Sequence, residues 1–228
     1  MALKEKTIAK VQEDVATDDV LAELPAEIEG LTLARLGREV DDRWELFNYT
    51  NAPQHLGFCA YYHQETDEYK VRVWRGLTEF CLMDFFAADY GNFVAKLRAG
   101  LVQAITDLVV YNPHKMSYVT SSLKITDWDY QALLPEELEG FRMFITPKEP
   151  FRVLNGSYIV VDYSDFQLKS NFIIYYNEFR CEFFGEAKIK EIPEMNYVFD
   201  SRTLPELEVK LQEHLRERLQ EIRRRSQS

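Results

Sequence analysis

The segment Leu24-Pro25-Ala26-Glu27-Ile28-Glu29-Gly30 recurs 110 residues later as Leu134-Pro135-Glu136-Glu137-Leu138-Glu139-Gly140. Further matches follow in the same order, at an offset of 114 residues. They are Asn48-Tyr49-Thr50 with Asp162-Tyr163-Ser164; Phe58, Tyr61 and Tyr62 with Phe172, Tyr175 and Tyr176; and Lys96, Leu97 and Leu101 with Lys210, Leu211 and Leu215. Collinear matches that share an offset indicate that the chain contains two copies of one module.

The change of offset locates an insertion in the second copy. Four additional residues are needed after the Leu-Pro block, in the segment around Thr146–Gly156. This segment contains Pro147 and Pro150, and proline is typical of loops. We therefore expect a longer loop at this point of the second copy.

Each copy continues with short runs whose lengths and residue types are typical of β-strands. In the first copy these runs are Leu31–Leu36, Trp44–Tyr49, Gly57–Tyr62 and Tyr69–Trp74, with a shorter fifth run at Cys81–Phe86. In the second copy they are Phe141–Ile145, Tyr158–Tyr163, Phe172–Tyr176 and Phe179–Phe184, with a fifth at Tyr197–Phe199. Because the connections are short, we expect antiparallel meanders.

The hydrophobic period then changes from that of a strand to that of a helix. Apolar residues are spaced by four in both copies: Phe93, Leu97, Leu101 and Ile105, and Leu207, Leu211, Leu215 and Leu219. Such a stripe predicts an amphipathic helix at the end of each copy. Ile8, Val11 and Val15 have helical spacing too, and predict one further helix near the N-terminus.

The predicted fold class is α+β: a tandem duplication of an antiparallel four- to five-stranded sheet followed by one long amphipathic helix, with an extra N-terminal helix. The predicted segments are an N-terminal helix in residues 1–23, a first repeat in residues 24–125 and a second repeat in residues 126–228. Two such copies are expected to pack as a pseudo-dimer within one chain.

Composition and charge limit the classes of partner. The chain has 228 residues and a net charge of −11, which disfavours a uniform phosphate-binding surface, so nucleic acid is not an expected partner. The cysteines, Cys59, Cys81 and Cys181, are odd in number and form no CxxC pair, which fits a reducing compartment. The sequence has no signal-peptide pattern and no apolar run near the about 20 residues of a membrane span. We therefore predict a soluble, cytoplasmic protein without a membrane partner.

Motifs of the common enzyme classes are not found. The sequence has no GxGxxG, no phosphate loop, no GxSxG and no HExxH. His55, His63, His114 and His214 lack the spacing of metal ligands. His55 and His63 lie near one predicted hairpin, where a structural role is favoured over metal binding. We expect no catalytic residue, no metal and no cofactor, and a non-catalytic protein is favoured over an enzyme.

Aromatic side chains supply the candidate binding site. Tyr49, Tyr62, Trp74, Tyr163 and Tyr176 lie in strands of the two copies and are expected to form aromatic platforms on open sheet faces. Adjacent strand residues face opposite sides, so one tyrosine of each Tyr-Tyr pair belongs to the core and the other to the open face. In the alternative and simpler interpretation, these rings pack in the core or between the copies.

The function that follows is that of a non-catalytic interaction or ligand-binding protein built from two pseudo-symmetric repeats. The expected partner is another protein or a peptide, with strand addition at a sheet edge as one mode, or a second copy in a homodimer. An enzyme with a site at the seam between the repeats is one alternative, because fold does not determine function.

A second alternative follows from topology. Repeats of four strands and a helix resemble the arrangement in the PUR and Whirly families, and this resemblance implies binding of single-stranded nucleic acid on sheet faces. Tyrosine and tryptophan rings would then stack on bases. No motif of either family is present, and the net charge of −11 opposes this alternative.

Overall fold

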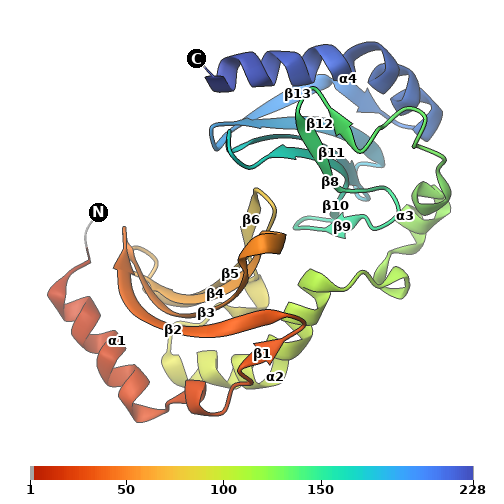
Figure 1. Cartoon of the computed structure of the whole chain (residues 1–228). Helices are drawn as coiled ribbons and strands as arrows, with labels where there is room; N and C mark the ends of the chain where they lie inside the picture. Colours follow the sequence, from red (N-terminus) through yellow and green to blue (C-terminus); the bar gives the residue numbers. More distant parts are fainter. Residues whose placement is uncertain (1–2, 228) are drawn as a thin grey trace. The chain divides into compact units, whose positions relative to one another are not determined.

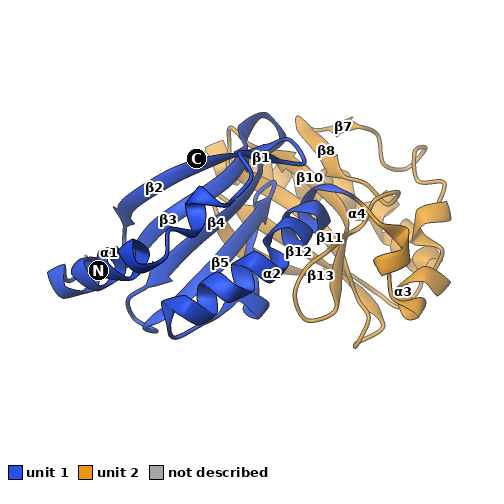
Figure 2. Cartoon of the chain, turned by 90° about the horizontal axis from the view of Figure 1, so that it is seen from below, with its two compact units in different colours: residues 1–110 blue, residues 111–228 orange. Residues whose placement is uncertain are grey.

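The computed structural model describes residues 3–227. The chain divides into two compact units, unit 1 with Met1–Val110 and unit 2 with Tyr111–Ser228, which are blue and orange in Figure 2. Each unit is α+β, with one antiparallel sheet followed by one long helix. The predicted fold class is therefore confirmed, including the extra helix near the N-terminus.

Unit 1 begins with helix α1 (Glu5–Thr17) and the 3-10 helix η1 (Val20–Ala22). Six strands follow, and each pairs antiparallel with the next. They are β1 (Glu27–Ile28), β2 (Leu31–Val40), β3 (Arg43–Asn51), β4 (Leu56–His63), β5 (Glu68–Arg75) and β6 (Thr78–Cys81), with the 3-10 helices η2 (Ala52–Gln54) and η3 (Met83–Phe85) between or after them. Helix α2 (Tyr90–Val109) ends the unit, and Figure 1 shows α1 and α2 on the same face of the sheet.

Unit 2 repeats this order with a different beginning. Short helices come first: η4 (Pro113–Lys115), α3 (Tyr118–Ser122) and η5 (Ile125–Asp127). The strands are β7 (Glu137–Leu138), β8 (Phe141–Ile145), β9 (Phe151–Arg152), β10 (Ser157–Asp165), β11 (Ser170–Asn177), β12 (Glu182–Ile189) and β13 (Ile192–Ser201). The sheet order is β13-β12-β11-β10-β8-β7, and β9 also pairs with β10. Helix α4 (Leu204–Gln227) covers one face (Figure 1).

The sheets contain more strands than the sequence patterns suggested. The Leu-Pro block itself forms a short strand in each copy, β1 or β7, which turns back through a Glu-Gly pair with positive φ, Glu29-Gly30 or Glu139-Gly140. The fourth strand of the second copy begins at Glu182 and not at Phe179. The reason is a turn in which the Asn177 side chain accepts hydrogen bonds from the backbone N–H groups of Phe179 and Arg180.

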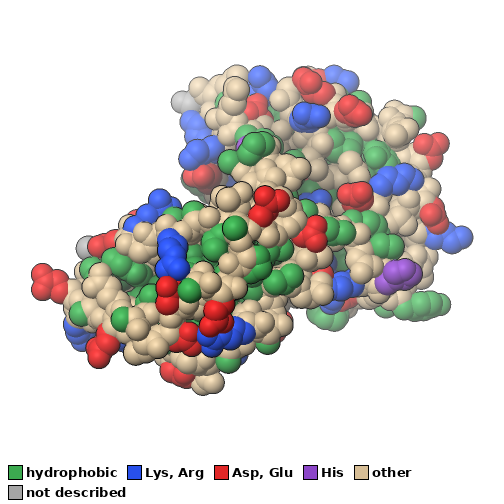
Figure 3. Space-filling view, turned by 60° about the horizontal axis from the view of Figure 1, so that its bottom comes forward, with side chains coloured by type: hydrophobic (Ala, Val, Ile, Leu, Met, Phe, Trp, Pro, Cys, Tyr) green, Lys and Arg blue, Asp and Glu red, His purple; other side chains and the backbone are tan. Residues whose placement is uncertain are grey.

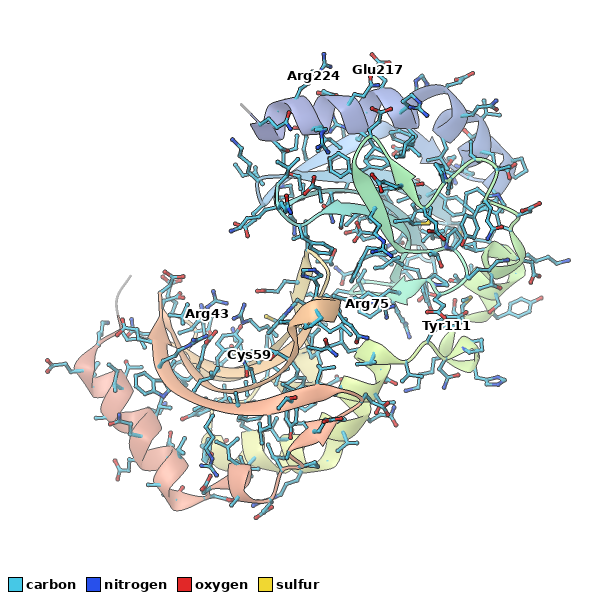
Figure 4. The ribbon with its side chains drawn as sticks, viewed as in Figure 1. Arg43, Cys59, Arg75, Tyr111, Glu217 and Arg224 are labelled. Carbon is cyan, nitrogen blue, oxygen red and sulfur yellow. The ribbon has the colours of Figure 1, made fainter. Side chains whose placement is uncertain are left out.

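The predicted helical stripes are buried in both units. Phe93, Leu97, Leu101 and Ile105 of α2 are buried, as are Leu207, Leu211, Leu215 and Leu219 of α4. Both helices begin at a side-chain cap: Asp89 accepts from the Asn92 N–H at 2.9 Å, and Thr203 accepts from the Glu206 N–H at 3.3 Å. Outward-facing residues of α4, such as Glu217 and Arg224, point away from the sheet in Figure 4.

Left-handed backbone positions recur at matching points of the two units. The pairs are Asp41 with Asn155, His55 with Lys169, Asp67 with Cys181, and Gly76 with Lys190, and each pair is 114 residues apart. These residues lie in or beside the turns between strands, where positive φ reverses the chain. The two units therefore follow the same path turn by turn, although the residue types at these positions differ.

Matching side-chain contacts recur as well. The Phe58 and Phe85 ring centroids are 5.9 Å apart, and those of their counterparts Phe172 and Phe199 are 4.8 Å apart. Lys96 of α2 donates to the Phe86 carbonyl at 2.7 Å, and Lys210 of α4 donates to the Asp200 carbonyl. The lysine match in the sequence thus corresponds to one contact that ties each helix to the chain that precedes it.

Between residues 3 and 227, the helices include none with the length and apolar character that a membrane crossing requires.

Candidate functional site

Most of the predicted aromatic residues lie in the cores of the units. Tyr49, Tyr62, Tyr163 and Tyr176 are buried on the faces that pack against helices. The ring centroids of Tyr62 and Tyr69 are 5.0 Å apart. The Tyr69 ring in turn stacks on Phe93 of α2, with 5.3 Å between the ring centroids. The structure therefore does not assemble these four rings into an exposed platform.

Trp74 lies on the opposite, open face of the unit 1 sheet. Its indole covers Gly57, where a Cβ atom would lie 1.9 Å from a ring carbon, so the close approach requires glycine. The Arg72 guanidinium lies 5.4 Å from the Trp74 ring. The open faces also carry Tyr61 and Tyr175, the other members of the two tyrosine pairs. Each pair is thus divided between the two faces, as predicted.

The open face of unit 1 carries a closed network of charges. Glu45 accepts from Arg38 at 2.9 Å and from Arg72 at 2.7 Å, and Arg72 also binds Glu79 at 2.8 Å. Burial of Glu45 opposes ionisation, but these guanidinium bonds lower the pKa of its carboxyl group. Because each of these four charges has an opposite partner, the network stabilises the face.

The thiol of Cys59 lies in the same region, on the side of the sheet away from α1 and α2 (Figure 4). Burial, and then the neighbouring Glu45 charge, raise the pKa of Cys59 to about 12. A thiol with this pKa is protonated at neutral pH, and the thiolate is the reactive form. Cys59 therefore behaves as a small buried apolar side chain and not as a nucleophile.

The open face of unit 2 buries a carboxylic acid. Asp162 is fully buried, and its side chain accepts hydrogen bonds from Ser164 at 2.8 Å and from Asn171 at 3.3 Å. Burial raises the pKa of Asp162 to about 7, although both hydrogen bonds favour the charged form. Its counterpart in unit 1 is the neutral Asn48.

A cavity of about 320 Å³ lies inside unit 1, between α1, η1, the β2–β3 hairpin and α2. Its floor consists of buried side chains, namely Val20, Leu46, Phe47, Tyr90, Phe93 and Leu97. Half-buried residues form the walls: Val15, Leu21, Leu36 and Trp44. Exposed Gln12, Arg35 and Gly37 form the mouth. The cavity thus has the apolar interior and polar entrance that small-molecule sites share.

A β-bulge in the β2–β3 hairpin shapes this cavity. Arg35 pairs with Phe47 and Arg38 pairs with Glu45, so Leu36 and Gly37 lie opposite the single residue Leu46. Leu46 is in turn the additional residue of β3 against β4, since Glu45 pairs with Tyr61 and Phe47 with Ala60. Leu46 and Phe47 therefore face the same helix-covered side, which a regular strand does not allow. Gly37 has a φ of 57°, a conformation that suits glycine. The bulge therefore opens space between the hairpin and the helices.

Acidic groups surround the mouth of the cavity. The Tyr90 hydroxyl donates to the Asp18 carbonyl at 3.0 Å. Burial, and then the negative charges of Asp18, Asp19 and Asp14, raise the pKa of Tyr90 to about 12. Arg35 is paired with Asp19 at 3.1 Å, so its charge is already balanced. The electrostatic environment of the mouth is consequently negative.

The corresponding region of unit 2 is built differently. Where unit 1 has only Leu36 and Gly37, unit 2 has residues 146–151, and Pro147, Pro150 and Phe151 of this segment are buried. Lys148 ties the segment to the Thr126 carbonyl at 2.9 Å. Unit 2 also carries Tyr130 at the position of Val20. Its own hollow, of about 450 Å³, has a mixed lining that includes Gln131, Glu136, Arg142 and Thr146.

The cavity residues were not predicted from the sequence, although one signal marks their location. The four-residue insertion of the second copy falls at the bulge that opens the cavity in the first. The region in which two copies of a module differ is where one copy can carry a site that the other lacks.

Neither a family model, nor a curated protein, nor a solved structure matches this chain. The fold defines it as a tandem α+β repeat.

Proposed function

We propose that this protein binds a small, largely apolar molecule, uncharged or cationic, in the cavity of unit 1. The observation that carries the proposal is an apolar cavity of about 320 Å³, whereas the hollow at the matching place in unit 2 has a mixed, more polar lining. Ligand sites in proteins range from about 300 to 1,000 Å³, so the cavity suits a ligand of up to three aromatic rings or a short aliphatic chain.

The charge around the mouth selects against anions. Asp14, Asp18 and Asp19 all act on Tyr90, and Arg35 is engaged by Asp19. Arg98, the other nearby cation, is bound by Asp18 and Glu23 at 2.9 and 2.8 Å. An anionic group at the mouth would therefore meet net negative charge, which costs binding free energy.

The lining favours binding over catalysis. Tyr90 has a pKa of about 12 and is protonated at neutral pH, so it is not a general base. Arg35 is held in an ion pair, and the remaining polar lining groups are the Gln12 amide and the Trp44 indole. None of these lining groups combines a nucleophile with an adjacent base, as covalent catalysis requires.

The proposal is tested with a matched pair of fluorescent probes. N-phenyl-naphthylamine is uncharged, and anilinonaphthalene sulfonate carries the same rings with an anionic group. We expect the uncharged probe to bind one site and the sulfonate to bind at least about tenfold more weakly, because of the acidic mouth. Equal binding of the two probes would contradict the charge argument, and no binding of either would overturn the proposal.

Two variants locate the site. Val15→Trp fills the wall of the cavity from α1, and Val20→Tyr introduces the residue that unit 2 carries at this position. Both should abolish binding of the uncharged probe while circular dichroism stays unchanged. The control is Val119→Trp, at a residue of unit 2 that is 41% exposed. If the control abolishes binding and the cavity variants do not, the proposed site is wrong.

An exposed apolar edge supports a second function, self-association. Strand β13 is an edge of the unit 2 sheet, and Ile192, Met195, Tyr197 and Val198 on it are exposed. The counterparts in unit 1 are Thr78, Cys81, Met83 and Asp84, which are more polar. We propose that β13 pairs antiparallel with β13 of a second copy, since a two-fold axis brings each exposed apolar residue against the same strand of the other copy.

Sedimentation tests this pairing. The chain has a mass of 26.9 kDa, and the proposal predicts a dimer of twice that mass. Met195→Lys should yield monomers, because it places like charges along the paired edge. Val209→Lys, at an exposed valine on α4, is the control and should remain dimeric. A wild-type monomer at high concentration would refute the pairing.

A further inference from the structure

Three potential metal ligands converge at one end of the unit 1 sheet. Asp42 lies in the turn between β2 and β3, His63 is the last residue of β4, and Glu65 lies in the turn between β4 and β5. One ligand atom from each of the three residues lies within 4.8 Å of the others. The closest pair is the His63 Nε2 atom and the Asp42 Oδ2 atom, at 3.0 Å. None of the three residues belongs to the lining of the unit 1 cavity.

Backbone pairing holds the two turns together. The Gln64 N–H donates to the Asp42 carbonyl at 3.0 Å, and Arg43 pairs with His63 in the sheet. Asp42 and His63 are therefore placed by the sheet itself and not by a free loop. Both side chains are about one-fifth exposed, which leaves the cluster accessible to an ion from solvent.

The imidazole is oriented for coordination by its second nitrogen. His63 Nδ1 forms a hydrogen bond with the Thr66 hydroxyl at 3.0 Å. A histidine that ligates a metal commonly engages its other ring nitrogen in such a bond, which fixes the ring orientation. Nε2 is thus the nitrogen that faces the Asp42 carboxylate.

We propose that Asp42, His63 and Glu65 form a binding site for a divalent transition-metal ion, with zinc as the preferred ion. Atoms bonded to one tetrahedral zinc at about 2.0–2.1 Å lie about 3.3 Å apart. The His63–Asp42 separation of 3.0 Å is within a few tenths of an ångström of this value. Glu65 is exposed and can rotate to complete the set. Two carboxylates balance the double charge, and water takes the fourth position.

The ligand types select among metals. An imidazole nitrogen with two carboxylate oxygens suits zinc, cobalt or manganese, whereas calcium and magnesium prefer all-oxygen sites. Zinc ranks above cobalt and manganese in the general order of affinity for such donors. The site is therefore expected to discriminate strongly against magnesium and calcium.

In unit 2, the matching pair of turns lacks these ligands. The counterparts of Asp42, His63 and Glu65 are Gly156, Asn177 and Phe179. The backbone bond is retained, because the Glu178 N–H donates to the Gly156 carbonyl at 2.9 Å. The Phe179 ring lies against Gly156, where a Cβ atom would be 2.7 Å from it. An aromatic contact thus joins the two turns in unit 2, whereas unit 1 has three potential metal ligands at the same place.

Cobalt provides the direct test, because a bound tetrahedral or five-coordinate Co²⁺ ion absorbs visible light. The full chain should bind one equivalent of Co²⁺ in 0.15 M salt with a visible absorption band, and Zn²⁺ should displace it. Millimolar Mg²⁺ should not displace it. No band, or binding of several equivalents with equal affinity, would overturn the proposal, because the latter is what a nonspecific acidic surface produces.

Variants assign the ligands. His63→Ala, Asp42→Asn and Glu65→Gln should each weaken Zn²⁺ binding at least about tenfold. Glu65→Gln is nearly isosteric at an exposed residue, so it tests the site without a risk to folding. The controls are His114→Ala, at an exposed histidine of unit 2, and Glu68→Gln, whose carboxylate pairs with Lys70. Both controls should bind as the wild type does, and equal losses in controls and ligand variants would refute the assignment. The titration needs no organic ligand, so its outcome is independent of the cavity proposal.

Discussion

The hydroxyl of Tyr49 donates a 2.6 Å hydrogen bond to the carbonyl oxygen of Pro25. The counterparts Tyr163 and Pro135 form the same bond at the same length in unit 2. Both bonds connect a central strand, β3 in unit 1 and β10 in unit 2, to the Leu-Pro block of the same unit. The two most clearly duplicated features of the sequence are thus partners in one contact.

Loss of this bond should weaken both units to a similar degree. We expect Tyr49→Phe and Tyr163→Phe each to lower the free energy of unfolding by about 1 kcal/mol, since the ring stays packed and one hydrogen bond is lost. Urea denaturation measures the change. Tyr118→Phe is the control, because Tyr118 is 88% exposed, and it should have no effect. An effect in only one unit would mean that the matched bonds are not equivalent in energy.

Asp162 should make stability depend on pH. Burial raises its pKa from 3.8 to about 7, so the folded chain binds a proton that the unfolded chain has released between these values. The contribution of Asp162 to folding stability is therefore greatest below pH about 4, falls as the pH rises towards 7, and is constant above it. Asp162→Asn, which introduces the residue of the matching position 48, removes this dependence.

The variant should be more stable than the wild type at pH 8, by a few kcal/mol at most, and nearly equal at pH 4. Urea midpoints at both pH values measure the difference. A constant difference across this range would show that Asp162 does not titrate with a raised pKa.

The contact between Trp74 and Gly57 provides another test. Gly57→Ala places a methyl group where the indole lies, so Trp74 must move from the sheet. We expect a loss of about 1–3 kcal/mol and a red shift of tryptophan fluorescence. Gly91→Ala is the matched control, because its Cβ would meet only Asp89 Oδ1 at 3.6 Å in the first turn of α2. That variant should be neutral or stabilising by up to about 1 kcal/mol.

Much of the fold could be predicted because the hydrophobic period of each segment survives in both copies. The stripes from Phe93 to Ile105 and from Leu207 to Leu219 are buried as expected. Strands β1 and β7 were not expected, because two residues of strand carry no periodic pattern.

The assignment of the tyrosines to faces failed for a different reason. Nearly every residue of β4 and β11 is buried, so the usual alternation between apolar and polar residues is lost. Residues an even number of positions apart in a strand share a face. Tyr62 lies four residues after Phe58 in β4, so a core position for Phe58 implies one for Tyr62.

The cavity residues and the proposed metal ligands could not be predicted for the same reason. In each group, the residues that come together in space are distant in the sequence. Asp42 and His63 meet only because β3 and β4 are paired, and a spacing search along the chain cannot detect them. The bulge at Leu46 is likewise a property of strand pairing and leaves no mark in composition.

Replacement of Lys190 by its counterpart residue, glycine, should raise the stability of the folded chain. It has a φ of 49°, a conformation that costs a side-chain-bearing residue about 1–2 kcal/mol, whereas the counterpart is Gly76. Lys190→Gly should stabilise the chain by a few tenths to about 1 kcal/mol, after the greater freedom of glycine in the unfolded chain is subtracted. The reverse change, Gly76→Lys, should destabilise it, and thermal unfolding measures both. Equal signs for the two changes would refute the strain argument.

The recurrence of the left-handed turns also has a practical consequence for protein engineering. A stabilising substitution is usually chosen from an alignment of relatives, and here the chain supplies a two-member alignment of itself. At each matched turn, the two copies carry different residues in the same backbone conformation, as with Asp67 and Cys181 or His55 and Lys169. Stabilising substitutions can therefore be chosen by exchanging residues between the two copies, without any other sequence.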